Sequence, residues 1–121
     1  MRIRTYLTFL VVWGLITLAG CKREDKYGKA LDANLPYETV GSVLANPAQF
    51  LDKEVALKGK IVKECGSGCW FYLDDGTGSI YVDLAPGNFA IPQRTGRVVM
   101  LKGKVMKDEE RIVVHASGVQ F

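Results

Sequence analysis

Histidine and cysteine are scarce in this chain, and that scarcity limits the chemistry it can carry. One histidine and three cysteines occur among 121 residues. The sequence has no serine-centred nucleophile motif and no phosphate-binding glycine loop. The adjacent carboxylates Asp74–Asp75 and Glu109–Glu110 fall in predicted turns, where solvation and turn formation account for them. We therefore expect a protein without enzymatic activity or resident cofactor, with thiol redox chemistry as the remaining catalytic alternative.

Charge is missing from Tyr6 to Gly20, and this run divides the chain. The segment Met1 to Arg4 supplies positive charge before it, and the apolar stretch from Tyr6 to Leu18 is shorter than the roughly 20 residues of a spanning helix. A basic start followed by a short apolar stretch is typical of a secretory signal peptide, which we assign to residues 1–20. A single membrane anchor is the alternative.

The signal peptide ends in Leu18-Ala19-Gly20-Cys21, which resembles a bacterial lipobox. The resemblance implies that Cys21 receives a diacylglycerol thioether, becomes the first mature residue and takes an acyl chain such as palmitate on its new amino group. Two or three acyl chains on one residue give a stable anchor. Lys22 follows in place of the aspartate of inner-membrane lipoproteins, which implies a place in the cell envelope, on the outer membrane facing the periplasm if the organism is Gram-negative.

The rest of the chain is predicted to be a tether followed by one domain. Loss of residues 1–20 removes two arginines and lowers the net charge from +3 to +1, so the basic excess says little about partners. Residues 21–37 are predicted to be the lipidated cysteine and a flexible tether, because a run of charges precedes the helix breakers Gly28 and Pro36. The domain is then 38–121.

Two segments of the domain echo each other, Val55–Lys63 and Val99–Lys107. Apolar and polar residues alternate in both, which predicts strands with one buried face. Their central glycines, Gly59 and Gly103, stand where a barrel strand bends sharply. The predicted inward residues are Val55, Leu57, Ile61, Val99, Leu101 and Val105, and the predicted outward residues are Lys58, Lys60, Lys102 and Lys104.

Further elements complete an all-β pattern. Strands are predicted over Trp70–Leu73 and Ser79–Leu84, joined by a glycine-rich turn, and over Ile112–Phe121. A short amphipathic helix is predicted from Glu38 to Leu51, broken at Asn46–Pro47, with Thr39 or Ser42 as its cap. Three strands, a connector and two more strands follow the order of a five-stranded OB-fold barrel.

The segment from about Thr39 to Phe121 resembles the OB-fold domains of small bacterial envelope proteins, in families named for their likeness to nucleic-acid-binding and tRNA-anticodon-binding domains. The resemblance rests on the helix-then-strand opening Val43–Lys63, the turn Leu73–Gly78 and the strand segment Gly103–Val105. It implies the barrel fold, whereas such barrels host many ligands. Nucleic acid is therefore a partner by fold analogy only.

The predicted outer face carries three rings, Trp70, Tyr72 and Tyr81, beside Lys58 and Lys60. OB-folds stack bases and hold phosphates with such residues. Because the lipobox implies a location outside the cytoplasm, an envelope protein or a polysaccharide suits this surface better than nucleic acid. The alternative is that the N-terminal helix covers the rings.

A second candidate site is the loop that holds Cys65 and Cys69. With Cys21 lipidated, these are the remaining thiols, and an even pair in an oxidising compartment favours a disulfide. A redox-active pair is one alternative. A copper or zinc site formed by Cys65, Cys69 and His115 is another.

These patterns together predict a lipid-anchored envelope binding or adaptor module with an OB-fold, attached to the membrane through its lipid. The alternative function is metal or thiol handling by the cysteine pair, and a purely structural subunit is the third hypothesis.

Overall fold

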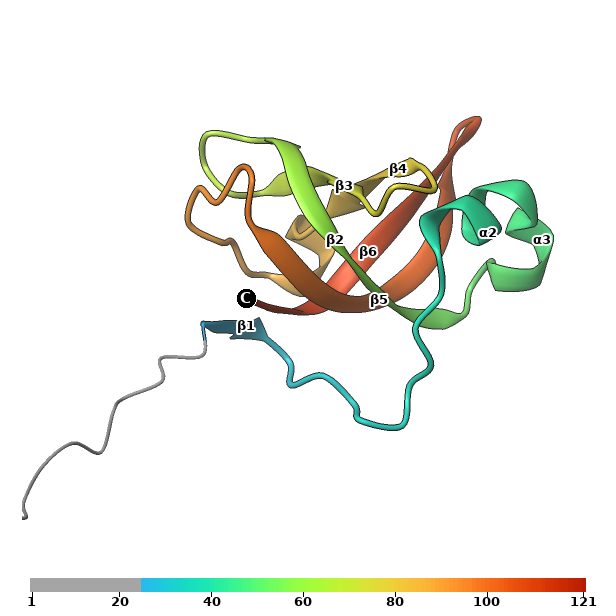
Figure 1. The fold of residues 1–121 in the computed structure, drawn as a ribbon, viewed down its shortest axis with the longest axis horizontal. Helices are drawn as coiled ribbons and strands as arrows, with labels where there is room; N and C mark the ends of the chain where they lie inside the picture. The colour runs from blue at the N-terminus through green and yellow to red at the C-terminus, as the bar shows by residue number, and fades with distance from the viewer. Residues whose placement is uncertain (1–24) are drawn as a thin grey trace, which may run out of the picture.

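A closed barrel of five strands dominates the structure, a computed structural model that describes residues 25–121 (Figure 1). The predicted signal peptide and Cys21 lie outside the described residues. The barrel strands are β2 (Glu54–Glu64), β3 (Trp70–Asp74), β4 (Ser79–Asp83), β5 (Val98–Asp108) and β6 (Arg111–Gln120).

The strand order identifies the barrel as an OB-fold. The strands run β6-β4-β3-β2-β5, and β5 pairs with β6 to close the sheet. The β4–β6 pairing is parallel, while the other pairings in the barrel are antiparallel. The connector between β4 and β5 begins with the short 3₁₀ helix η2 (Ala85–Gly87). The predicted fold class is confirmed, and each predicted strand begins and ends within one residue of the observed one.

Alternation along the strands places the core as expected. The inward positions of β2, β3, β4 and β5 are buried in one cluster together with residues of β6. Two positions that alternation places outside are nevertheless buried, Ala56 at 5% exposure and Lys102 at 7%. Lys102 is the charged one. The segment that follows β1 covers it, and its Nζ lies 3.3 Å from the Asp32 carboxylate. A charged side chain at such depth needs this partner.

The two strand glycines allow neighbouring backbones to approach closely. A Cβ on Gly59 would lie 2.7 Å from the Asp74 carbonyl oxygen, and one on Gly103 would lie 2.6 Å from that of His115. Gly103 also follows a register shift in the β5–β6 pairing, where the strand bends. The glycines therefore serve the barrel bend that the sequence predicts.

The helical segment closes one end of the barrel. It consists of α2 (Val40–Ala45) and α3 (Pro47–Phe50), separated at Asn46 as predicted. The Thr39 side chain accepts a hydrogen bond from the backbone N–H of Ser42 at 3.1 Å, which makes Thr39 the cap. Val40 and Val43 are fully buried. Among the described residues no helix is long and apolar enough to cross a membrane.

The β3–β4 turn holds α2 in place. The Asp75 carboxylate accepts a hydrogen bond from the backbone N–H of Val40 at 2.8 Å, and the Thr77 hydroxyl accepts one from that of Gly41 at 2.8 Å. Desolvation raises the pKa of Asp75, but hydrogen bonds from Thr77, Val40 and Gly78 outweigh it and lower that pKa below its ordinary value. The carboxylates in this turn therefore organise structure.

Part of the expected tether is ordered against the barrel. Residues 26–28 form a short strand, β1 (Lys26–Gly28), which pairs antiparallel with the end of β6. Tyr27 packs edge-on against Phe121, with ring centroids 6.0 Å apart. The Asp25 carboxylate also lies 3.1 Å from the Arg94 guanidinium. Residues 25–28 of the predicted tether are therefore held on the barrel by the ring of Tyr27 and by the free edge of β6.

Candidate functional site

Three partly exposed rings meet on the outer face of β3 and β4. Trp70, Tyr72 and Tyr81 form what we call the aromatic cluster. Ring centroids are 5.9 Å apart for Trp70 and Tyr72, 5.6 Å for Trp70 and Tyr81, and 5.4 Å for Tyr72 and Tyr81. These distances fall in the range for favourable aromatic pairs. All three rings are partly exposed, so the cluster presents one continuous aromatic surface.

The strand register explains why the rings meet. Trp70 and Tyr72 stand two residues apart on β3 and share a face, and Tyr72 lies directly opposite Tyr81 on β4. The inward neighbours on these strands, Phe71 and Val82, are fully buried. Because α2 packs against the β3–β4 turn at the far end of β3 from Trp70, the helix does not cover the cluster (Figure 1).

Arg111 adds a cation to the cluster that sequence reasoning missed. Its guanidinium carbon lies 4.3 Å from the centroid of the Tyr81 ring, a cation–π contact. It also lies 3.5 Å from the Asp108 carboxylate across the β5–β6 turn. Desolvation and the charge of Asp83 raise the pKa of Tyr81, while Arg111 opposes them. Arg111 is the first residue of β6, so only the parallel β4–β6 pairing brings it here.

The strand register adds a lysine to those predicted beside the cluster. Lys60 lies opposite Asp74, beyond the rings, and Lys58 lies opposite Met100 on β5. The residue opposite Tyr72 is Lys63, because the register of β2 shifts between Ile61 and Lys63. Strict alternation from Ile61 would turn Lys63 inward, so no sequence pattern indicated it.

The two domain cysteines lie together in the β2–β3 loop. The Cys69 thiol donates to the Cys65 sulfur with the Sγ atoms 2.7 Å apart, and the Ser67 hydroxyl lies 3.0 Å from the same sulfur. Both cysteines are free, and no disulfide joins them. Hydrogen bonds from Cys69 and then Ser67 lower the pKa of Cys65 from 9.0 to about 6. The loop therefore favours a thiolate at Cys65.

Backbone contacts brace this loop against the β4–β5 connector. The Gly68 carbonyl accepts a hydrogen bond from the Ile91 N–H at 3.1 Å, and the Gly66 carbonyl accepts one from the Gln93 amide at 3.3 Å. One carboxylate oxygen of Glu64 accepts from the backbone N–H groups of residues 94 and 95, each at 2.7 Å. The loop is thus fixed without a disulfide.

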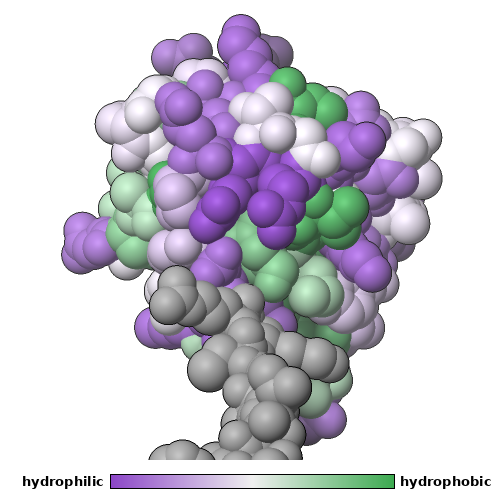
Figure 2. Space-filling model, turned by 60° about the vertical axis from the view of Figure 1, so that its left-hand side comes forward, coloured by the Kyte–Doolittle hydropathy of each residue, from purple (hydrophilic) through white to green (hydrophobic). Residues whose placement is uncertain are grey.

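The thiol loop and the aromatic cluster are neighbours. The Cys65 N–H donates to the Trp70 carbonyl at 3.0 Å, and the Leu84 N–H donates to the Cys69 carbonyl at 3.0 Å. Figure 2 views the end of the molecule that carries the β2–β3 and β4–β5 loops, where hydrophilic residues predominate and hydrophobic ones form separate patches. The two sequence-predicted sites therefore adjoin at one end of β3.

His115 does not complete a metal site with the cysteines. It lies on β6, opposite Asp83 of β4 and Lys104 of β5. Within residues 25–121 no three His, Cys, Asp or Glu side chains are grouped closely enough to hold a metal ion. Two thiols without a third ligand do not form the set that a tetrahedral zinc site uses.

Comparisons with known proteins add to the evidence for the fold. No protein-family model and no curated protein matches the chain. The hypothetical protein ygiW from E. coli is similar in structure, with a TM-score of 0.52 and 24% identity over 76% of this chain and 96% of that one. A putative aspartyl-tRNA synthetase from Leishmania major Friedlin is similar with a TM-score of 0.56 and 16% identity, over 75% of this chain and 21% of that one. At such identities the likeness extends to the fold alone.

Proposed function

We propose that this protein is a lipid-anchored binding or adaptor module of the cell envelope. The observation that carries the proposal is the aromatic cluster, three partly exposed rings on one face, flanked by Lys63 and Arg111. Large exposed aromatic surfaces usually mark interaction sites. The faces of strands two and three of an OB-fold, here β3 and β4, are where this fold binds its ligands.

The cluster suits a partner with both apolar faces and polar edges. Tyrosine and tryptophan present a broad apolar ring and one polar group, so they can pack against a sugar ring and still form hydrogen bonds. Arg111 already occupies one face of Tyr81, and this leaves Trp70 and Tyr72 as the rings most available for stacking. We favour a polysaccharide over a protein partner, since repeating sugar rings match a row of side chains along one strand.

The location rests on the leader sequence. The lipobox Leu18-Ala19-Gly20-Cys21 supports attachment of the lipid at Cys21, and Lys22 supports the outer membrane in a Gram-negative organism. The strand β1 begins at Lys26, five residues after Cys21, and pairs directly with the barrel strand β6. The domain would therefore sit close to the lipid headgroups, within reach of envelope polysaccharide.

A capture experiment tests the proposed site. The full chain, bound to beads in detergent, is incubated with a solubilised envelope fraction, and captured sugar and protein are measured separately. The Trp70→Ala/Tyr72→Ala double variant should lose at least tenfold in captured polysaccharide, if each ring contributes about 1 kcal/mol, the lower end of the range for a base stacked on an aromatic side chain. The matched control is Tyr37→Ala, which removes a ring that is 54% exposed and outside the cluster.

Three outcomes would contradict this proposal. Equal capture by the double variant and the unchanged chain removes the cluster from the binding site. Capture of protein that survives periodate oxidation of the sugars makes the partner a protein. Processing of Cys21→Ser at the same place as the native chain, with no loss of membrane attachment, refutes the lipid anchor.

A second candidate function is thiol handling by Cys65 and Cys69. It is favoured by their 2.7 Å Sγ–Sγ separation and by a Cys65 pKa of about 6. Such a pair can pass two electrons and two protons to a disulfide of another protein and become a disulfide itself. We expect a disulfide in protein from an oxidising compartment. Free-thiol counting with metal analysis decides: a permanent disulfide that resists mild reduction, with no copper or zinc, removes this function.

A further inference from the structure

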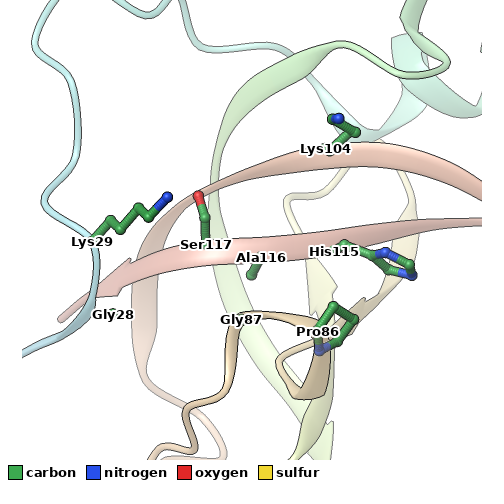
Figure 3. A pocket seen from close by; sticks show the side chains of 8 residues that line it. All are labelled: Gly28, Lys29, Pro86, Gly87, Lys104, His115, Ala116 and Ser117. Atoms are coloured by element: carbon green, nitrogen blue, oxygen red, sulfur yellow. The ribbon is translucent and has the colours of Figure 1, made fainter.

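A pocket of about 420 Å³ lies on the outer face of the barrel, where β1, η2, β5 and β6 come together (Figure 3). We propose that it binds an oxyanion, the carboxylate or phosphate group of the ligand that the aromatic cluster takes. The link between this anion and the ligand of the aromatic cluster rests on the proposed function. Binding of an anion in the pocket can be measured independently of it.

Three hydrogen-bond donors from different segments line the pocket, Lys29, Lys104 and His115. Figure 3 shows Lys29 extending toward the Ser117 hydroxyl and the His115 ring beside Pro86, with Lys104 on the neighbouring strand. Both lysines are exposed at their positions, whereas His115 is half-buried. Two ammonium groups and an imidazole around one hollow match the needs of a carboxylate or a phosphate, while the Ser117 hydroxyl donates to the Lys102 carbonyl at 3.5 Å.

The cations of the pocket have no internal partner. Within the described part of the chain, neither Lys29 nor Lys104 forms an ion pair, in contrast to Lys102, which lies 3.3 Å from Asp32. The acids nearest in register are Glu54 of β2, opposite Lys104, and Asp83, opposite His115, whose carboxylate accepts a hydrogen bond from the Ala85 N–H at 3.1 Å. Neither acid is among the residues that line the pocket, so the two lysines are the charged groups of its lining.

The backbone builds the hollow and holds Lys29 at its edge. The Lys29 N–H donates to the Ser117 carbonyl at 2.8 Å, which fixes the chain after β1 onto β6. Gly28 has a φ of +71°, and a Cβ there would collide with the same carbonyl. A Cβ on Gly87 would lie 2.8 Å from the Ala116 carbonyl. The walls are therefore close-packed backbone, and the lysine side chains are the movable parts.

The pocket adjoins the aromatic cluster through one row of the sheet. Trp70 lies opposite Asp83, Asp83 opposite His115, and His115 opposite Lys104, across β3, β4, β6 and β5. Adjacent strands are about 4.8 Å apart, so His115 stands roughly 10 Å from Trp70. A ligand that spans both sites needs a ring and an acidic group at about that separation, as an acidic sugar polymer has.

The size of the pocket favours an anion attached to something larger. A volume near 420 Å³ exceeds that of a single phosphate and falls in the range of small-ligand sites. Pro86 and Ala116 also give the lining an apolar portion. An acidic group would meet the lysines while the carbon skeleton beside it packs on these residues.

The test titrates the isotope-labelled full chain, in detergent, with inorganic phosphate and separately with acetate, at constant ionic strength. His115 and Ser117 resonances should shift and saturate. Removal of each lysine should weaken phosphate binding roughly fivefold, because a charge at about 4 Å contributes about that factor in water. The variants are Lys29→Gln, Lys104→Gln and the pair together. Lys58→Gln, at an exposed lysine of β2 outside the pocket, is the matched control.

The outcomes separate the two proposals. Saturable phosphate shifts that survive Trp70→Ala/Tyr72→Ala but fall in the lysine variants support the pocket, whether or not the cluster captures polysaccharide. A stronger response to acetate than to phosphate assigns the subsite to carboxylates, and the reverse assigns it to phosphates. Shifts that never saturate, or that are the same in Lys29→Gln/Lys104→Gln and in the control, overturn the inference.

Discussion

Replacement of Asp75 by alanine should cost far more stability than its position in a surface turn suggests. Its carboxylate accepts hydrogen bonds from the Val40 N–H at 2.8 Å and from the Thr77 N–H at 2.9 Å. The Val40 N–H is one of the helix donors that has no partner within α2, and Val40 itself is fully buried. An orphaned buried donor costs about 1–3 kcal/mol, and the lost turn bonds add about 1 kcal/mol. We expect a total near 3 kcal/mol.

Urea unfolding of the full chain in detergent, followed by intrinsic fluorescence, measures this loss. With a slope of about 1–1.5 kcal/mol per M, the midpoint of Asp75→Ala should fall by roughly 2 M. The matched control is Asp74→Ala, because the Asp74 carboxylate accepts only the local Gly76 N–H, at 2.8 Å. A loss in Asp75→Ala no larger than in Asp74→Ala would refute the idea that Asp75 ties α2 to the barrel.

The pH dependence gives an independent check on the same contact. The pKa of Asp75 is lower in the folded protein than its ordinary value of 3.8. A lowered pKa contributes stability that is fully present above the unfolded value and is lost as the pH falls through the folded one. The stability difference between the native chain and Asp75→Asn should therefore be constant near neutral pH and shrink below about pH 4. A difference that grows toward low pH would contradict the assignment.

Two further predictions concern the thiol loop. Gly68→Ala should destabilise the domain by about 3 kcal/mol, since Gly68 has a φ of +73° and a Cβ there would collide with the Ile91 carbonyl. The collision would strain the backbone and break the hydrogen bond from the Ile91 N–H to the Gly68 carbonyl. Chemical denaturation measures the loss of stability, and a loss below 1 kcal/mol would contradict the prediction. In the reduced protein, alkylation of Cys65 by iodoacetamide should have its pH midpoint near 6, and Cys69→Ala should move that midpoint upward by removing the largest cause of the lowered pKa; an unchanged midpoint in that variant would be the opposing result.

The barrel was predictable because its strands carry their own signals. Alternation in Val55–Lys63 and Val99–Lys107 fixes which side chains face inward, and inward residues such as Leu57 and Leu101 are fully buried. A register slip of one residue would expose that whole set, so the pattern determines the pairing as well as the strand. The break between α2 and α3 was equally local, because Pro47 cannot continue the helix before it.

The β1 strand and the burial of Lys102 were not predictable from such patterns. Three residues, Lys26–Gly28, are too few to show a period, and their neighbours have the composition of a linker. They form a strand because the end of β6 offers unpaired backbone groups and because the Tyr27 ring packs against Phe121. The chain that follows then covers Lys102. Lys102 is buried because of a segment 70 residues away in the sequence, and alternation within a strand cannot predict such a contact.

Some residues of the candidate site were predictable from the local pattern of one strand, and others were not. Trp70, Tyr72 and Tyr81 were found because position on a strand is enough to place them on one face. The two cations beside them, Lys63 and Arg111, were missed. Lys63 faces the cluster through a register shift, and Arg111 reaches Tyr81 through a parallel pairing between distant strands. The alternation along a strand predicts which face the rings lie on, whereas the cations beside them are brought there by the pairing of strands that are distant in the sequence.

The way the barrel closes also leaves the outer face of β3 and β4 uncovered by the helices and by β1. The helices α2 and α3 cover the end at the β3–β4 turn, and β1 occupies the edge of β6 (Figure 1). The thiol loop is braced to the β4–β5 connector, which fixes the opposite end. The outer face of β3 and β4 is bordered by Lys63, Arg111 and the lysine-lined pocket. A ligand held there would meet rings supported by a packed core, so little entropy is lost in ordering them on binding.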